Sequence, residues 1–206
     1  MKTKTKSLTF MAILIAIMLI FGFTPIGYIP LPFAKITLMC LPVIIGTLVL
    51  GLRTGMGLAL VFIITSLFQL VITPDELTIT LMPINPALYL VNLIVPRLFI
   101  PITTYFMYRL LAKKNERAGL FVASAVGSLT NTLLVLILLQ LFFAPAIAEI
   151  YSIGMAGATA MIWGIFVSNG ILEAVVATMI CPFVIMAVRK VVPPITENKK
   201  TIKEAA

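Results

Sequence analysis

Ionisable side chains inside apolar segments are the residues of this sequence with the clearest chemical meaning. Arg97 lies about ten residues into an apolar stretch at 87–111, between Pro96 and Pro101, and Glu173 lies at a comparable depth in another at 160–188. In hydrocarbon, a charge is costly unless it faces a partner or a water-filled cavity. Two interpretations of Arg97 are open at this point. It forms an ion pair with Glu173 that ties two helices together, or it presents its planar guanidinium to an anionic ligand, since this group binds carboxylates through two parallel hydrogen bonds.

A stripe of small and polar residues marks one face of a further helix. It consists of Ser124, Gly127, Ser128 and Asn131, at positions i, i+3, i+4 and i+7, which share a helical face. Small residues at this spacing allow either close contact with another helix or space for a ligand. Because Asn131 ends the stripe at mid-depth, we favour a ligand wall.

Further polar side chains occur in the apolar stretches. Asn169 and Glu173 are four residues apart and therefore share a helix face. Together with Arg97 and Asn131 they predict one polar pocket for a small ligand, reaching from the outer side to mid-membrane. The remaining candidate ligand-binding residues are Ser66, Gln69, Asn85 and Tyr89.

The elements that must position these residues are membrane-spanning helices. The chain has 206 residues, of which 61% are hydrophobic and 11% charged, and a soluble domain of this size cannot bury so much apolar surface. A helix needs roughly 20 apolar residues to cross the hydrocarbon core. The sequence predicts an all-α integral membrane protein with six transmembrane helices, at 8–23, 38–50, 55–72, 87–111, 120–143 and 160–188. These form one membrane domain over residues 1–191, followed by a polar cytoplasmic tail at 192–206.

The basic residues predict how these helices are oriented. Thirteen of the 15 lysines and arginines fall on one side if there are six crossings, and the other side carries Lys35 with Asp75, Glu76 and Glu149. The positive-inside rule then places both termini in the cytoplasm. Because the charges punctuate the ends of apolar segments, we expect no nucleic-acid partner. The first apolar run has no small-residue cleavage site after it, so we take it as a span and not as a signal peptide.

The three outer connections, at 24–37, 73–86 and 144–157, contain prolines and glycines yet are largely apolar. A loop surrounded by solvent would be polar. We therefore expect these connections to fold over the bundle and cover the pocket. Simple packing at the membrane interface is the alternative.

Several chemistries lack their residues in this sequence. The chain has no histidine, and its two cysteines, Cys40 and Cys181, have no CxxC spacing, so we expect no metal site or other cofactor. The sequence contains no phosphate-binding loop, G-x-S-x-G elbow or H-E-x-x-H motif, so we expect neither ATP hydrolysis nor an enzyme. A binding subunit for import is favoured. A self-sufficient secondary transporter or channel, and an intramembrane enzyme or assembly factor, are the alternatives.

Parts of the sequence resemble a known family. The stretch IPLPFAKITLMCLPVIIGTLVLGLRTGMGLALVFIITSLFQ, with GSLTNT and NGILEAVVATMICPFVIMAVRK further on, is similar to substrate-binding (S) components of energy-coupling factor (ECF) transporters. The resemblance covers nearly the whole chain. ITLMCLPVIIG, at 36–46, resembles the pantothenate-specific S components most closely. Riboflavin and folate members would be expected to carry an acidic segment at this place, and this sequence has no carboxylate there.

The resemblance implies a six-helix binder of a vitamin in the cell membrane, most closely pantothenate, with another small vitamin such as riboflavin as the alternative. It implies assembly with the transmembrane coupling protein EcfT and with two cytoplasmic ATPases that supply the energy. In such proteins an A-x-x-x-A motif of the first helix contacts the coupling protein, and Ala12 and Ala16 match it. The resemblance also implies that the substrate lies under the first and third outer loops, against helices four to six.

Overall fold

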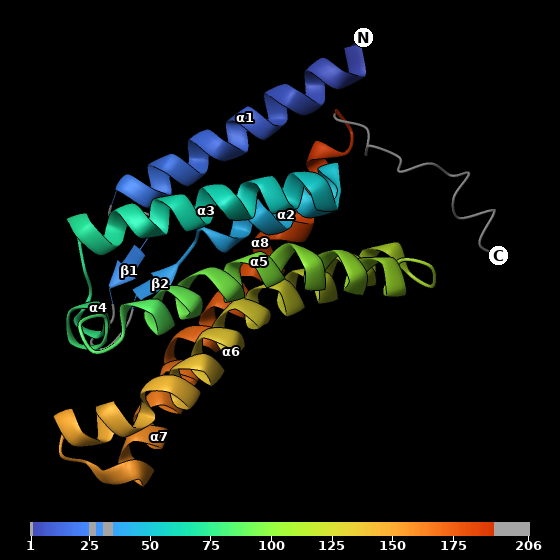
Figure 1. Cartoon of the computed structure of the whole chain (residues 1–206). Coiled ribbons are helices and arrows are strands. Elements are labelled where there is room, and N and C mark those ends of the chain that lie inside the picture. Colours follow the sequence, from blue (N-terminus) through green and yellow to red (C-terminus); the bar gives the residue numbers. More distant parts are fainter. Residues whose placement is uncertain (1, 25–27, 31–34, 192–206) are drawn as a thin grey trace.

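The computed structural model describes residues 2–24, 28–30 and 35–191 (Figure 1). The described chain forms a bundle of helices with one short antiparallel pair of strands, in which Tyr28 lies opposite Thr37. The predicted polar tail at 192–206 lies outside the described residues. The elements are α1 Lys2–Phe23, β1 Tyr28–Pro30, β2 Lys35–Thr37, α2 Cys40–Leu50, α3 Leu52–Ile72, α4 Glu76–Leu81, α5 Pro86–Leu111, α6 Glu116–Ile150, α7 Gly154–Ile165, the π-helical turn η2 Phe166–Gly170, and α8 Ile171–Val188.

Five helical stretches of the described chain are long and apolar enough to cross a membrane. The last of them runs from α7 through η2 into α8 without a break. These lengths and compositions agree with the predicted helical membrane architecture for five of the six expected spans. They are Thr5–Phe23, Leu52–Ile72, Pro86–Leu111, Glu116–Ile150 and Gly154–Val188.

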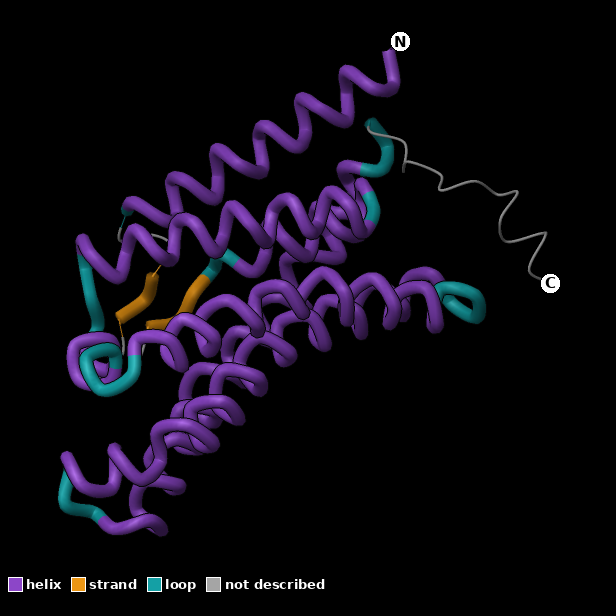
Figure 2. The backbone as a smooth tube through the Cα atoms, viewed as in Figure 1, coloured by secondary structure: helices purple, strands orange, loops and turns teal. Residues whose placement is uncertain are grey.

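The second predicted span, at 38–50, is a helix too short to cross alone. Helix α2 has 11 residues, and at roughly 1.5 Å per residue it covers about half of the hydrocarbon core. It ends at Gly51, whose φ of 93° is a left-handed conformation that glycine adopts without a steric penalty. Every residue of α2 is buried, because a segment that is apolar on all sides suits the interior of a bundle. The strand β2 leads directly into α2 (Figure 2).

Helices α2, α3 and α5 meet closely at Gly55 on α3. A Cβ atom added there would collide with the Thr47 hydroxyl on α2 and would lie 2.9 Å from the Cβ atom of Pro101 on α5. Small residues allow such close backbone approach between membrane helices. This contact holds α5 at Pro101, one helical turn after Arg97. The position of Arg97 is therefore set by the packing of α5 against α2 and α3.

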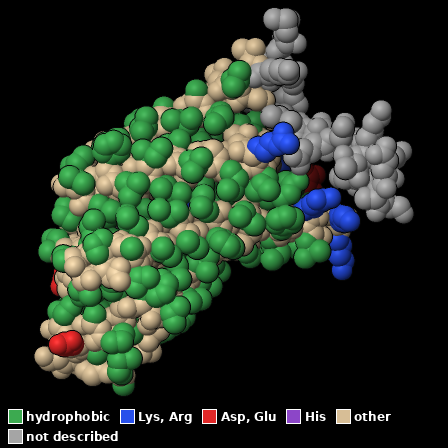
Figure 3. Space-filling model, viewed as in Figure 1, with side chains coloured by type: hydrophobic (Ala, Val, Ile, Leu, Met, Phe, Trp, Pro, Cys, Tyr) green, Lys and Arg blue, Asp and Glu red, His purple; other side chains and the backbone are tan. Residues whose placement is uncertain are grey.

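The beginning and the end of the described chain lie at the same end of the bundle. The Lys6 ammonium donates to the carbonyl of Val191 at 3.3 Å, and lysine and arginine side chains gather at this end on the face shown in Figure 3. Here Arg189, the residue directly after α8, binds the Glu116 carboxylate at 2.6 Å and the Leu48 carbonyl at 2.7 Å, which ties the end of α8 to α6 and α2. Helix α4 and the strand pair lie at the opposite end (Figure 1). This arrangement is compatible with an even number of crossings.

The described parts of the three connections predicted to lie outside contain more helix and strand than the sequence predicts. In the first connection, residues 25–27 and 31–34 lie outside the described chain, and β1 and β2 belong to the remainder. The second contains α4, capped by Asp75, whose carboxylate accepts from the Thr78 N–H at 2.8 Å. Most of the predicted third loop is helix, because α6 continues through Pro145 to Ile150. Alanines flank this proline, and their high helix propensity favours continuation.

Candidate ligand-binding site

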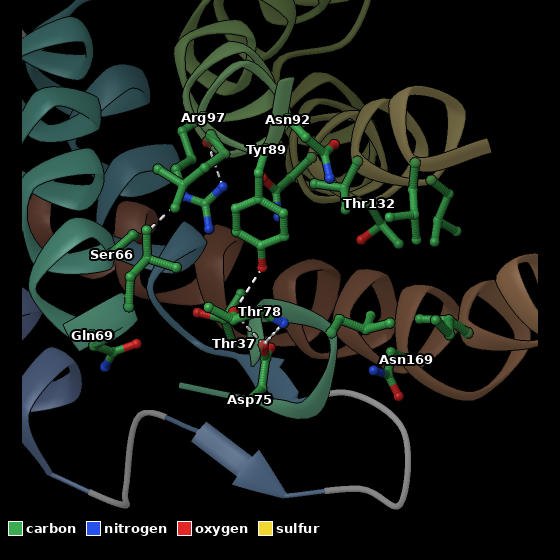
Figure 4. A pocket seen from close by; sticks show the side chains of 18 of the residues that line it. Thr37, Ser66, Gln69, Asp75, Thr78, Tyr89, Asn92, Arg97, Thr132 and Asn169 are labelled. Atoms are coloured by element: carbon green, nitrogen blue, oxygen red, sulfur yellow. Dashed lines mark hydrogen bonds between the residues drawn. The ribbon is translucent and has the colours of Figure 1, made fainter. Parts of the chain in front are cut away.

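A cavity of about 210 Å³ lies among α3, α4, α5, α6, η2 and α8. The segment after α3 and the strand β2 complete its wall (Figure 4). This volume is below the roughly 300–1,000 Å³ of pockets that take drug-sized ligands, so it suits a small metabolite. The polar residues that line it are Thr37, Ser66, Gln69, Thr73, Asp75, Thr78, Tyr89, Asn92, Arg97, Asn131, Thr132, Asn169 and Glu173.

Arg97 brings a positive charge to this wall from α5. Its Nε donates to Ser66 Oγ at 3.1 Å, and its Nη1 donates to the Leu93 carbonyl. The guanidinium lies over the Phe62 ring, 4.9 Å from the ring centroid, a distance at which cation–π attraction operates. Ser66 and Phe62 on α3 therefore hold Arg97 in place, and Arg97 remains part of the cavity lining. In addition, the backbone carbonyl of residue 97 has no helical N–H partner, because Pro101, one turn later, lacks an N–H.

Glu173 is hydrogen-bonded through both carboxylate oxygens. Its Oε1 accepts from the Thr37 backbone N–H at 2.8 Å, and its Oε2 accepts from Thr132 Oγ1 at 3.0 Å. The side chain is 6% exposed. Among the described contacts, Glu173 therefore bonds to the end of β2 and to α6. An ion pair between Arg97 and Glu173, which was one of the two interpretations of Arg97, is not among the ion pairs found in the described part of the chain.

Three asparagines supply buried acceptor oxygens that have no hydrogen-bond partner. Asn92, Asn131 and Asn169 are 7%, 6% and 4% exposed, and the Oδ1 atom of each is unpaired within the described structure. Buried polar atoms in proteins nearly always have a partner, so each such atom requires an explanation. All three residues line the same cavity, where a ligand or water could donate to them. Asn169 lies in η2, and π-helical turns of this kind are frequent at functional sites.

Helix α4 covers the cavity and is attached to its wall by hydroxyl groups. The hydroxyls of Thr78 on α4 and Tyr89 on α5 lie 2.7 Å apart. On the outer side of α4, Tyr151 donates to the Glu76 carboxylate at 2.9 Å. Partial burial, and then this hydrogen bond, raise the pKa of Tyr151 above its ordinary value, so its hydroxyl remains a proton donor at neutral pH.

Seven of the nine predicted ligand-binding residues lie around this one cavity: Arg97, Asn131, Tyr89, Asn169, Gln69, Ser66 and Glu173. Asn85 does not line it, because its side chain caps α5 by accepting from the Leu88 N–H at 3.1 Å. Ser128 is fully buried outside the lining. Its neighbour Gly127 faces Thr104 and Ile44 so closely that a Cβ would collide with the threonine hydroxyl. Most of the stripe on α6 therefore packs against other helices, and Asn131 alone of the stripe lines the cavity.

The lining also includes residues that were not among the predicted site residues. Asn92 lies one turn after Tyr89 on α5, and that helical spacing could have identified it. Thr132 directly follows Asn131 in the sequence and faces Glu173. Thr37 reaches the cavity only because β2 ends there, and a threonine in an external connection carries no sequence signal for such a role.

The arrangement suits a small polar ligand that carries an anionic group. One guanidinium, four side-chain amides, two carboxylates and several hydroxyls line one region, and Leu93, Val135, Leu136 and Leu139 add apolar surface. The two carboxylates are already engaged by the protein, because Glu173 accepts from Thr37 and Thr132 and Asp75 accepts from Thr78. Within the described ranges, no three His, Cys, Asp or Glu side chains come together as a metal site would require. The available interactions are hydrogen bonds, the positive charge of Arg97 and apolar contact, which are the means of binding a ligand.

Two comparisons with known proteins agree with one another. The family model described as "ECF transporter, substrate-specific component" matches residues 6–185. The chain is also similar to the protein named "Pantothenic acid transporter PanT" of Lactococcus lactis subsp. cremoris (strain MG1363), with 30% identity over 200 residues. That match covers 92% of this chain and 96% of the relative.

Proposed function

This chain belongs to the family of substrate-specific components of ECF transporters, and from that premise we propose that it binds pantothenate for import. The relative that covers nearly its whole length is named as a pantothenic acid transporter. Membership in the family supports a vitamin as the transported substrate, and the choice of pantothenate among vitamins is the part that the cavity must support.

The observation that carries the proposal is the combination of Arg97 with the three unpaired amide oxygens in one small cavity. Pantothenate has a carboxylate at one end, an amide in the middle and two hydroxyls beside a branched apolar centre. The guanidinium is complementary to the carboxylate. The amide oxygens of Asn92, Asn131 and Asn169 could accept from the ligand's hydroxyl and amide hydrogens, and the leucine and valine side chains suit its branched centre.

Flat aromatic vitamins fit this lining less well. They are commonly held by stacking on aromatic rings, and the aromatic residues among the described lining are Phe62 and Tyr89. Arg97 already covers the Phe62 ring, and the Tyr89 hydroxyl is bonded to Thr78. Trp163 lies on α7 outside the lining.

Energy for transport comes from other subunits in this proposal. A transmembrane coupling protein and two cytoplasmic ATPases would assemble with the chain, in the cell membrane and with both chain termini on the cytoplasmic side. Ala12 and Ala16 on α1 are exposed, whereas Leu14 and Met18 on the same helix are buried against the bundle. The alanine face of α1 is therefore accessible to another helix, and alanines at this spacing permit close approach.

The direct test is to identify which small molecule remains bound to the chain. Protein extracted in a mild detergent and purified by an affinity tag is denatured, and the released compounds are analysed by mass spectrometry. We expect pantothenate in an amount comparable to the protein, and much less of it with an otherwise identical Arg97→Ala protein. Release of a different vitamin by the wild type would contradict the assignment.

A further inference from the structure

We propose that Glu173 is a positioning residue that fastens the β1–β2 strand pair to the cavity and thereby slows the exit of the ligand, without binding the ligand itself. The proposal rests on the function proposed above and adds a role for a buried carboxylate that ligand recognition does not require. Two features of the structure carry it: the contacts of the carboxylate, and the connection of Thr37 to a rigid helix.

The carboxylate connects two separate elements at the wall of the cavity. From the first turn of α8 it accepts the Thr37 N–H at the end of β2 at 2.8 Å and the Thr132 hydroxyl on α6 at 3.0 Å. Removing the acceptor of a hydrogen bond leaves a buried donor without compensation, which is costly. Strand β2 also contacts η2, the turn that precedes α8. Glu173 thus attaches an outer segment of the chain to the inner wall of the bundle.

Thr37 is the junction between the strand pair and the buried core. Its hydroxyl accepts from the Met39 N–H at 3.2 Å, and α2, entirely buried, begins at Cys40. One side of Thr37 is therefore fixed by the core, whereas the described contact that holds its own backbone N–H is the one with Glu173. Loss of this contact would free the end of β2 to move away from the cavity while α2 stays in place.

Direct recognition of an anionic ligand is a poor use for this side chain. A carboxylate repels another carboxylate at short range, and both oxygens of Glu173 already accept hydrogen bonds from the protein. Holding the strand pair requires a side chain that accepts hydrogen bonds and is long enough to reach Thr37. It does not require that the side chain be charged.

Three substitutions separate a positioning role from a role for the charge. Glu173→Gln keeps the length and an acceptor oxygen but removes the charge. Glu173→Asp keeps the charge but is one methylene shorter, so it cannot reach both Thr37 and Thr132. Glu173→Ala removes both. We expect the Gln protein to release pantothenate at nearly the wild-type rate. The Asp and Ala proteins should release it about tenfold faster or more, because the buried Thr37 N–H is left without an acceptor.

Rates are measured by loading purified protein in lipid nanodiscs with radiolabelled pantothenate and chasing with an excess of unlabelled compound. Association rates are measured in parallel and should change much less than dissociation rates, since the empty site keeps Arg97 and its asparagines. If the Gln and Asp proteins lose affinity in the opposite order, with Asp close to wild type, the charge matters and the positioning role is refuted.

Hydrogen–deuterium exchange of the ligand-free protein tests the anchor independently of the substrate. The peptide that contains the Thr37 amide should exchange slowly in the wild type and in Glu173→Gln, and about tenfold faster in Glu173→Asp and Glu173→Ala. Unchanged protection in Glu173→Ala would overturn the proposal. If the wild type fails to bind pantothenate but the exchange pattern follows this order, the vitamin assignment is wrong and the anchor stands.

Discussion

At the scale of single residues, the cavity combines one guanidinium with amide oxygens that lack a partner in the described structure. Arg97 is oriented by Ser66 and by the Leu93 carbonyl, so it pays little further ordering entropy on meeting an anion. The oxygens of Asn92, Asn131 and Asn169 are desolvated without compensation. Both features favour a ligand with an anionic group and hydrogen-bond donors over an empty site.

Removal of the guanidinium should weaken pantothenate binding strongly. Charge-assisted hydrogen bonds contribute about 1.5–3 kcal/mol, so Arg97→Ala should raise the dissociation constant at least tenfold, as measured by titration calorimetry. Arg97→Lys should restore little of the affinity, because an ammonium cannot form the two parallel hydrogen bonds of a guanidinium. Affinity unchanged in Arg97→Ala would leave only a structural role for this residue.

Replacement of an unpaired amide should separate stability from binding. Asn131→Leu keeps the branched shape and the number of heavy atoms of the side chain and removes a buried unpaired acceptor, so the ligand-free protein should unfold at the same or a higher temperature. Its stabilisation by pantothenate should be reduced, since the stabilisation by a ligand at a given concentration falls as the dissociation constant rises. Thermal unfolding with and without pantothenate measures both effects.

Ser128→Ala is the matched control for this experiment. Ser128 is also buried with an unpaired oxygen on α6, but it lies outside the cavity lining. It should keep the full ligand-induced shift. A normal shift in Asn131→Leu together with a reduced shift in Ser128→Ala would contradict the placement of the site.

The sequence predicted the polar residues that stand out against an apolar background, and missed those that do not. Arg97, Glu173 and Asn131 are conspicuous because hydrocarbon penalises such side chains. Thr37 is inconspicuous because a polar residue in an outer connection is ordinary, and its place beside Glu173 depends on the pairing of β1 with β2. Asn85 lies at a helix start, where an asparagine more often caps the helix than binds a ligand.

At the scale of helices, hydropathy predicted where the apolar segments lie better than where they begin and end. Helix α2 is shorter than its apolar segment because β2 and Gly51 bound it, and its burial depends on five neighbouring helices that contact it. Helix α6 extends beyond its predicted end because Pro145 does not interrupt it. Local hydrophobicity does not encode either outcome, since both depend on packing.

The exposed alanine face of α1 should be required for assembly and not for ligand binding. Ala16→Leu would fill the space that another helix needs for close approach. In cells that co-express the coupling protein and the two ATPases, these subunits should copurify with the wild type and be lost from Ala16→Leu, while pantothenate binding by the isolated chain persists. Ala160→Leu, at an exposed position on α7, is the control. Normal assembly of Ala16→Leu would remove this role from α1.

At the scale of the whole molecule, charge and cavity define two different ends of the bundle. On the face shown in Figure 3, lysine and arginine side chains gather where the beginning and the end of the described chain meet. Helix α4 and the strand pair lie at the other end (Figure 1). With the positive-inside rule, the cavity would open towards the outside. A single cysteine in place of the exposed Glu76 should then react with a membrane-impermeant maleimide on intact cells, and one in place of the exposed Lys114 should not.

The wild-type protein supplies the control for the labelling, since Cys40 and Cys181 are buried and should not react. Reaction of only the cysteine that replaces Lys114 would show that the orientation is the reverse of the one proposed. Reaction of the cysteines at both positions would contradict the proposed topology.

The central claim, that this chain binds pantothenate, is tested most directly by isothermal titration of the purified, ligand-free protein. We expect a saturable heat signal close to one pantothenate per chain, no comparable signal from riboflavin, and a dissociation constant at least tenfold weaker in Arg97→Ala. The absence of any heat signal on adding pantothenate, with a protein that remains folded and monodisperse, would contradict this claim.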